Sequence, residues 1–214
     1  MKSSIILPTY KEKDNIVELI QVIFNALEPE GLDFEVVVVD DNRPDGTAEA
    51  VRQNFDGDPR VKLFVRTSER GLATAIRYGV EHSTGQILVS MDTDFNHDPQ
   101  ILPQMIKFLD HYDIIIGSRF VMAGGMEDRF RQFSSLIYNY GIRLLFRTPV
   151  HDNLSGFFPS AVTNWRRWTW IKFIMATATI LSDCSWWPIS AVIVCWKFPS
   201  SIDCACTATA KLNF

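Results

Sequence analysis

Two carboxylates at the end of an apolar segment are the residues of this sequence best suited to chemistry. Asp92 and Asp94 directly follow the apolar run 87–91, with Thr93 between them. In an extended segment, residues two apart point to the same side, so the two carboxylates repel each other unless a cation lies between them. A divalent ion held by carboxylates and substrate phosphates is typical of magnesium sites. An isolated pair of this kind is more often a solvated acidic turn, but its place after a predicted central strand favours the cation site.

Other polar residues follow predicted strands in the same way. Arg119 comes after an apolar run, and a guanidinium beside a hard cation suits a diphosphate leaving group, because both neutralise the developing charge. Arg119 and Arg131 could equally be surface cations. Asp40 could bind a base or ribose, or it could cap the turn 42–46 that follows it.

The elements that must position these residues alternate between strand and helix. Apolar runs predict strands and 3-4 spacing predicts helices, and a capping box predicts that the first helix opens near Asn15, with Glu18 three residues later. This alternation predicts an α/β fold with a mostly parallel central sheet and helices on both faces, whose ligands bind outside the carboxyl ends of the strands. The predicted strands are 3–8, 34–39, 61–66, 86–91 and 113–117, and the later helices are 47–55, 72–82 and 99–110.

A further helix is predicted over residues 130–147, which mix apolar side chains with arginines. This helix either packs on the sheet as a surface helix or lies at a membrane interface as an amphipathic helix.

Composition changes abruptly near Phe158. All four cysteines and all six tryptophans lie after residue 160, and the formal charge is −7 over residues 1–158 but +3 over 159–214. We therefore divide the chain into a core, 1–158, and an atypical Trp- and Cys-rich tail, 159–214. The tail is predicted to be a membrane-associated segment, a pair of soluble segments or a stretch translated out of frame.

The sequence speaks against several other classes of protein. A net charge of −4 gives no reason to expect nucleic-acid binding. The chain lacks the glycine motifs of dinucleotide-binding and P-loop proteins, and its cysteine spacing does not favour zinc. The apolar stretch at the N-terminus is too short for a signal peptide, which predicts a cytoplasmic start.

Together these residues resemble the family-2 glycosyltransferases of the GT-A fold, and among them most closely the dolichol-phosphate mannose synthases. The resemblance covers about three quarters of the chain, in order. The stretches that carry it are LPTYKEKDNI at 7–16, VVVDDNRPDGT at 37–47, GLATAIRYG at 71–79, MDTDFNHDP at 91–99, GSRF at 117–120, Arg131 with Ser135, and DNLSGF at 152–157.

The resemblance implies a Rossmann-like core that binds a nucleotide-sugar, and it implies roles for particular residues. The implied nucleotide-sugar-binding residues are Pro8, Tyr10, Glu12, Val38, Asp40, Asp92, Thr93 and Asp94. Asp94 and Asn96, with Asp92 as a further candidate, are the implied ligands of Mg²⁺ or Mn²⁺. The implied receivers of the acceptor phosphate are Arg119, Arg131 and Ser135, and the implied catalytic residues are Asp94, Arg119 and Arg131.

The implied reaction moves mannose from GDP-mannose to dolichyl (polyprenyl) phosphate with inversion, at the cytoplasmic surface of a membrane to which the protein is peripheral or weakly anchored. A lipid phosphate is already ionised at pH 7, so it needs no strong general base. Two alternatives stay open, namely UDP-glucose or another donor, and a non-catalytic remnant that binds nucleotide-sugar. The remnant is considered because residues 159–214 lack the family's acceptor-side segment.

Overall fold

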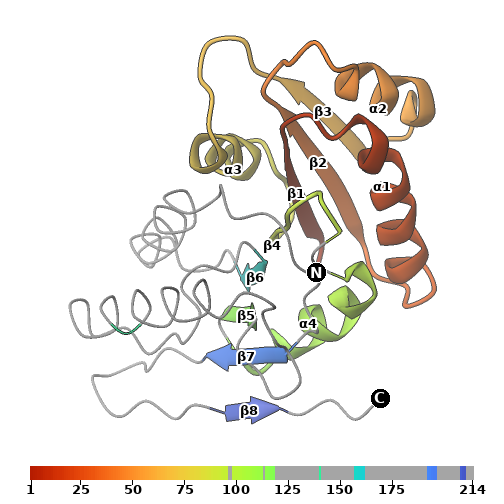
Figure 1. Cartoon of the computed structure of the whole chain (residues 1–214). Helices are drawn as coiled ribbons and strands as arrows, with labels where there is room; N and C mark the ends of the chain where they lie inside the picture. Colours follow the sequence, from red (N-terminus) through yellow and green to blue (C-terminus); the bar gives the residue numbers. More distant parts are fainter. Residues whose placement is uncertain are drawn as a thin grey trace.

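The computed structural model describes residues 1–95, 98–112, 114–118, 140, 157–161, 192–196 and 208–210. Its strands form one sheet in the order β3-β2-β1-β4-β6-β5-β7-β8 (Figure 1). The first four strands in this order are mutually parallel, which confirms the predicted parallel centre. They are β1 (Ser3–Thr9), β2 (Phe34–Asp40), β3 (Val61–Val65) and β4 (Ile87–Ser90).

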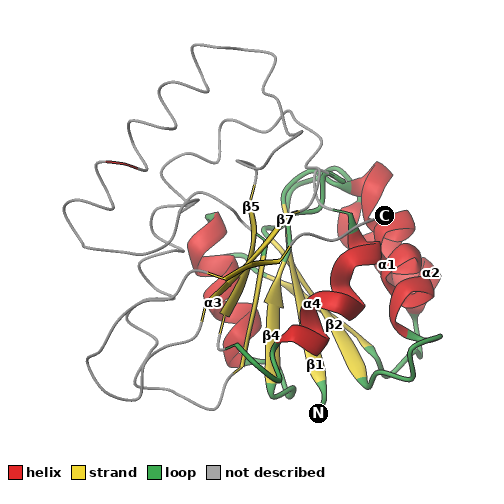
Figure 2. Ribbon diagram, turned by 90° about the horizontal axis from the view of Figure 1, so that it is seen from below, coloured by secondary structure: helices red, strands yellow, loops and turns green. Residues whose placement is uncertain are grey.

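Helices cover both faces of this parallel part, as predicted (Figure 2). Alternate residues of a strand point to opposite faces. Leu7 and Val38 therefore pack against α1, α2 and α4, whereas Ile6 and Val37 pack against α3 on the other face. The helices are α1 (Lys13–Leu27), α2 (Thr47–Phe55), α3 (Leu72–Glu81) and α4 (Leu102–Phe108), with a 3-10 turn η1 (Pro99–Ile101) before α4.

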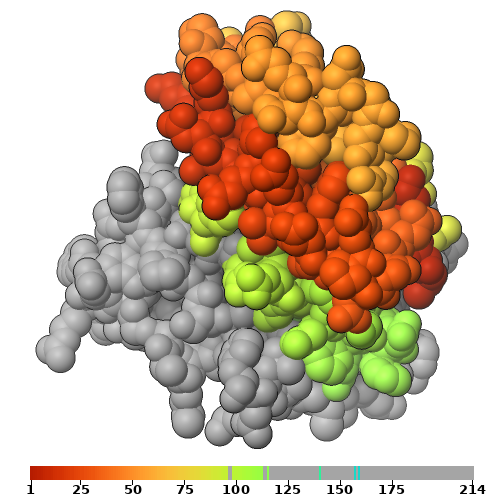
Figure 3. Space-filling model, turned by 90° about the vertical axis from the view of Figure 1, so that its right-hand side faces the viewer, coloured from red at the N-terminus to blue at the C-terminus, as the bar shows by residue number. Residues whose placement is uncertain are grey.

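Helices pack on the two faces of the sheet in different ways. Figure 3 shows residues of α1 and α2, in red and orange, beside those of α4, in green, on one continuous surface. On the other face α3 approaches β1 closely, because Gly79 has no side chain. A Cβ atom at Gly79 would lie 2.5 Å from Cγ2 of Ile6.

Beyond β4 the sheet becomes antiparallel, which the sequence analysis did not predict. β6 lies between β4 and β5, and β7 and β8 extend the sheet from β5. β7 and β8 come from the predicted tail, and β6 begins at its boundary. The bounds are β5 (Ile114–Ser118), β6 (Phe158–Ala161), β7 (Val192–Trp196) and β8 (Ala208–Ala210).

The first helix begins two residues before the predicted position, and its predicted capping box does not form. α1 begins at Lys13, after Glu12 at the N-cap position, and no side chain caps it. The side chain of Asn15 instead donates to Glu12 Oε2 at 3.1 Å. The capping box does not form because the backbone amide of Asn15, which Glu18 would have to accept from, donates to the carbonyl of Glu12. The amide of Glu12 donates to the hydroxyl of Thr47, which ties the start of α1 to the loop before α2.

The predicted helix 99–110 is divided. Pro103 has no N–H to donate to the carbonyl of Pro99, and Leu102 donates to that carbonyl instead, which gives a 3-10 turn. The α-helical part ends at Phe108.

The helix predicted over 130–147 lies outside the described residues apart from Tyr140, which is helical and exposed. Within the part of the chain that the structure describes, no helix has both the length and the apolar character required to span a bilayer.

Candidate functional site

The carboxyl ends of β2, β1 and β4 are adjacent, and the loops that follow them carry the residues singled out from the sequence (Figure 1). Thr9 at the end of β1 is in register with Asp40 at the end of β2, and Ser90 of β4 is in register with Ile6. Segments that are 31 and 84 residues apart in sequence thus meet at one edge of the sheet, as parallel strands require. This edge is the candidate site.

Asp40 is buried at the centre of this edge and is held in place by two hydrogen bonds. The hydroxyl of Thr9 donates to Oδ1 at 3.1 Å, and the amide of Asn42 donates to Oδ2 at 3.2 Å. Burial raises the pKa of Asp40, these two bonds oppose the rise, and the nearby carboxylates Asp45 and Asp41 add to it. Asp40 does cap the following turn, which was one of its two predicted roles. Its other predicted role, binding a base or ribose, stays a prediction.

Carboxylates from three loops gather around Glu12. Burial raises the pKa of Glu12; a hydrogen bond from Asn15 opposes the rise, and the negative charges of Asp94, Asp45 and Asp92 add to it. These charges act on Glu12 because the loops after β1, β2 and β4 lie at the same edge. A concentration of negative charge of this kind is stabilised by a cation.

Asp45 links two of these loops. The hydroxyl of Thr47 donates a short hydrogen bond to Asp45 Oδ2 and accepts one from the amide of Glu12 at 3.1 Å. Burial would raise the pKa of Asp45, but the hydroxyl and amide of Thr47 and the amide of Lys13 lower it. Asp45 therefore stays ionised and adds to the negative potential of the edge.

The donor set suits a hard divalent cation in its chemistry. Asp92 and Asp94 are half-buried and offer oxygen atoms, which Mg²⁺ and Mn²⁺ prefer. Among the described residues, no three His, Cys, Asp or Glu side chains are arranged as a complete metal site. The two carboxylates would thus hold such an ion together with other oxygen donors.

The other predicted residues that the structure describes lie partly at this edge and partly behind it. Val38 packs in the core against α1, two residues before the end of β2. Pro8 is buried within β1, and Thr93 is buried between the two aspartates. Tyr10 is exposed at the edge. The predictions for Asn96, Arg119, Arg131 and Ser135 fall outside the described residues.

A buried ion pair that the sequence did not indicate supports the edge. Arg66, directly after β3, donates through Nε to Asp41 Oδ1 at 2.8 Å and makes a second, shorter contact through a terminal nitrogen. It also donates to Thr74 and to the carbonyl of Gly71, while the amide of Gly71 donates to Asp41 Oδ2 at 2.8 Å. The pair joins the loop after β2 to the start of α3.

Arg66→Lys is expected to lower the free energy of unfolding by about 1–3 kcal/mol, because an ammonium cannot reproduce the planar set of donors around Asp41. Urea denaturation at pH 7 measures this loss. Arg77→Lys is the matched control, since Arg77 pairs with Glu81 on the exposed face of α3. Equal urea midpoints for the two variants would count against a supporting role for Arg66.

The backbone at the edge is unusual in three places. Among the described residues, the non-glycine residues with positive φ are Lys11, Asn42 and Phe95, at 63°, 51° and 58°. Each lies in a loop that follows one of the strands β1, β2 and β4. Left-handed backbone costs energy for residues with a side chain and often occurs at functional sites. Of the three, only asparagine is a type that signals this conformation in a sequence.

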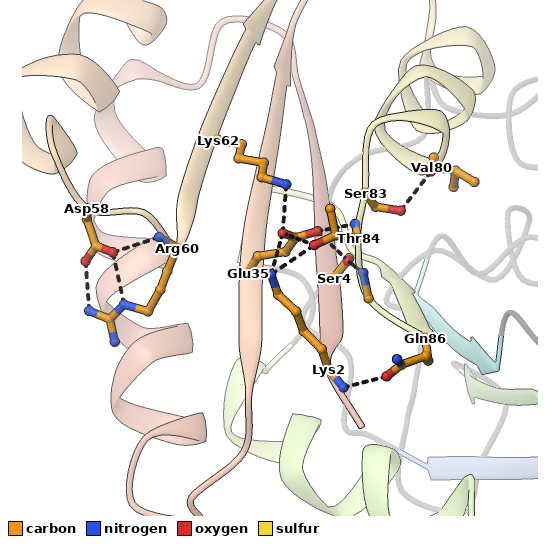
Figure 4. A network of polar contacts seen from close by, with 11 residues as sticks. Lys2, Ser4, Glu35, Asp58, Arg60, Lys62, Val80, Ser83, Thr84 and Gln86 are labelled. Atoms are coloured by element: carbon orange, nitrogen blue, oxygen red, sulfur yellow. Dashed lines mark hydrogen bonds and ion pairs between the residues drawn. The ribbon is translucent and has the colours of Figure 1, made fainter.

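A second polar cluster lies at the opposite, amino end of the strands (Figure 4). Glu35 of β2 is fully buried and accepts hydrogen bonds from Lys2, Ser4 and Thr84, and it forms an ion pair with Lys62. Each carboxylate oxygen of Glu35 has partners, so the cluster joins β1, β2, β3 and the loop before β4 without presenting an unsatisfied group.

Residues 4–162 match the family model described as glycosyl transferase family 2. This match covers most of the chain and agrees with the class of protein that the fold and the acidic residues at the strand ends indicate. The chain belongs to glycosyl transferase family 2.

Curated relatives make the likeness more specific. The chain is 38% identical over 165 residues to a dolichol-phosphate mannosyltransferase of Pyrococcus furiosus, covering 74% of this chain and 46% of that protein. It is 34% identical over 158 residues to the protein of the same name from Saccharomyces cerevisiae, covering 72% and 59%. The chain therefore spans about half the length of the curated relatives it matches.

Solved structures support the fold. The mannosyl-3-phosphoglycerate synthase of Rubrobacter xylanophilus aligns with a TM-score of 0.60 at 18% identity, over 76% of this chain and 53% of that one. The glucosyl-3-phosphoglycerate synthase of Mycobacterium tuberculosis, in complex with Mn²⁺, UDP and phosphoglyceric acid, aligns with a TM-score of 0.56 at 19% identity, over 76% and 56%. At these identities the likeness is one of fold, and it confirms the predicted GT-A type.

Proposed function

We propose that this chain is the donor-binding part of an inverting glycosyltransferase that moves mannose from GDP-mannose to a polyprenyl phosphate such as dolichyl phosphate. The observation that carries this proposal is the gathering of Asp45, Asp92 and Asp94 around Glu12, with Asp40 near Asp45, at one edge of a parallel sheet. The names of the curated relatives support the choice of donor sugar and acceptor.

Asp94, with Asp92 and Asn96, would hold Mg²⁺ or Mn²⁺, which supplies positive charge for the diphosphate of the donor. Asp40 would orient the nucleoside, since its carboxylate is fixed by Thr9 and Asn42. Pro8, Tyr10, Glu12 and Thr93 complete the proposed nucleotide-sugar site, and Val38, whose side chain packs in the core, would support it from behind.

The acceptor phosphate would be received by Arg119, Arg131 and Ser135 and would attack the anomeric carbon directly. The bond from that carbon to the donor diphosphate breaks as the new bond to the lipid phosphate forms, so the configuration inverts. Because the acceptor is ionised at pH 7, these residues need only position it and neutralise its charge.

The core would comprise residues 1–158, and 159–214 would form a separate tail. Work on a lipid phosphate requires a membrane surface, and the protein would sit on its cytoplasmic side as a peripheral or weakly anchored protein. No nucleic acid is involved.

Transfer of labelled mannose from GDP-mannose to a polyprenyl phosphate, with and without Mg²⁺ or Mn²⁺, tests this function. We expect lipid labelling that requires the ion. UDP-glucose is the comparison donor, and preferential labelling from it would replace the proposed donor. Ion-dependent binding of GDP-mannose without transfer would instead identify a non-catalytic chain that binds nucleotide-sugar. The proposal fails if the chain neither binds any of the sugar nucleotides tested nor transfers a sugar from one of them.

A further inference from the structure

Tyr10 and Arg43 form a pair at the edge of the candidate site. Tyr10 follows β1, and Arg43 follows β2 in the turn that Asp40 caps. The Cζ atom of Arg43 lies 4.8 Å from the centre of the Tyr10 ring, which is the separation of a cation–π contact. Tyr10 is 51% exposed. The pair thus joins the loop after β1 to the loop after β2 at the surface of the site.

The guanidinium of Arg43 has a hydrogen-bonding group that the protein leaves unsatisfied. Its Nε is buried and has no hydrogen-bond partner in the part of the chain that the structure describes. A buried donor without an acceptor is costly, so such groups are uncommon unless they have a role. Contact with Tyr10 holds the guanidinium in place. Its two terminal nitrogens, unlike Nε, are not enclosed by the protein and can donate to a ligand that enters the site.

The strand order indicates which part of a donor would reach Arg43. The loop with Asp92 and Asp94 follows β4, whereas Arg43 follows β2, and β1 lies between these strands. Two strand spacings amount to about 10 Å. If the diphosphate lies near Asp92 and Asp94, the nucleoside extends across β1 towards Asp40 and Arg43. The chemistry presented to Arg43 is therefore that of the base.

We infer that Arg43 is a specificity-determining residue that recognises a guanine base, an inference that rests on the function proposed above. The planar guanidinium can donate two parallel hydrogen bonds to the adjacent acceptors O6 and N7 of guanine. Adenine presents an amino donor in place of O6, and the smaller uracil ring has no equivalent of N7. Tyr10 positions the guanidinium for this contact.

The test compares GDP with 7-deaza-GDP, which lacks only the N7 acceptor. Binding is measured by titration calorimetry in the presence of Mn²⁺, with UDP as a third ligand. We expect wild-type protein to bind GDP about tenfold more tightly than 7-deaza-GDP. Arg43→Met keeps an apolar side chain against Tyr10 and removes the donors, and it is expected to bind GDP and 7-deaza-GDP equally.

Two further variants make the test specific. Arg43→Lys keeps the charge without the paired donors, and it should also lose the preference for GDP over 7-deaza-GDP. Arg52→Met removes an exposed arginine of α2 and should keep the wild-type preference. Circular dichroism establishes that each variant is folded.

The outcomes separate this inference from the proposed function. If wild-type protein binds GDP but does not distinguish it from 7-deaza-GDP, or if both Arg43 variants keep the distinction, Arg43 does not recognise the base and the inference is overturned. If wild-type protein binds neither GDP nor UDP, the proposed function fails together with the inference.

Discussion

Asp94→Ala is expected to lower kcat/KM for mannose transfer by about 10³-fold, the scale of losing a main electrostatic stabiliser of a developing charge. Asp94 lies in the loop after β4, and its charge acts on Glu12 from the neighbouring loop. Removing its carboxylate would weaken the hold on a divalent cation at the point where the diphosphate gains charge. Initial rates of lipid labelling, measured over a range of Mg²⁺ or Mn²⁺ concentrations, give this loss.

Asp110→Ala serves as the control, because Asp110 is an exposed carboxylate in the turn after α4, away from the strand ends. It should transfer mannose at the wild-type rate. If Asp94→Ala kept wild-type rates and the same dependence on the ion, Asp94 would not be a metal ligand. A rate loss that excess ion restores would instead support a ligand role with weakened affinity.

Glu35→Ala is expected to lower the free energy of unfolding by about 3–5 kcal/mol, which is typical when one partner of a buried ionic cluster is removed. Glu35 is fully buried, and the substitution would leave Lys2 and Lys62 without their shared carboxylate. Urea denaturation at pH 7 measures the change. Glu81→Ala removes the exposed partner of Arg77 and is expected to leave the midpoint unchanged.

The same residue predicts how stability depends on pH. Burial alone would raise the pKa of Glu35, but hydrogen bonds from the Thr84 amide, Lys2, Lys62 and Ser4 hold it well below its usual range. A carboxyl whose pKa is lower in the folded than in the unfolded protein stabilises the fold above the unfolded value, about 4.3, and this contribution is lost as the pH falls towards the folded value.

The free energy of unfolding of the wild-type protein should therefore decrease as the pH falls below about 4. The free energy of unfolding of Glu35→Gln should decrease less over the same interval. Urea denaturation between pH 7 and pH 3 provides the comparison. Parallel curves for the two proteins would show that Glu35 does not contribute to acid sensitivity.

Strong local patterns explain what the sequence could predict. The continuous apolar run of β2 and the 3-4 spacing of α1 define their elements within one or two residues, because burial on both faces or on one face dictates those patterns. The acidic strand ends were predicted to meet because parallel strands place their carboxyl ends together. Those predictions depend on short-range order and on one topological rule.

What the sequence could not predict depends on contacts between distant segments. β6 pairs with β4 and β5 although its four residues are far from both in sequence, and nothing local specifies that register. Arg66 was missed because a lone arginine after a strand usually belongs to the surface, and only the fold brings Asp41 and Gly71 to it. Glu35 escaped notice for the same reason, since its partners lie on other strands.

The order in which the strands enter the sheet has a consequence for folding during synthesis. β1 to β4 come in succession from the first 90 residues and pair with one another, whereas β6 inserts beside β4 much later. As the chain leaves the ribosome, the strands that carry Asp40, Asp92 and Asp94 can pair before the rest of the sheet exists. Until residues 158–161 emerge, β4 has a free edge that can pair with another chain. A slowly translated stretch before residue 158 would therefore extend the period in which nascent chains can aggregate.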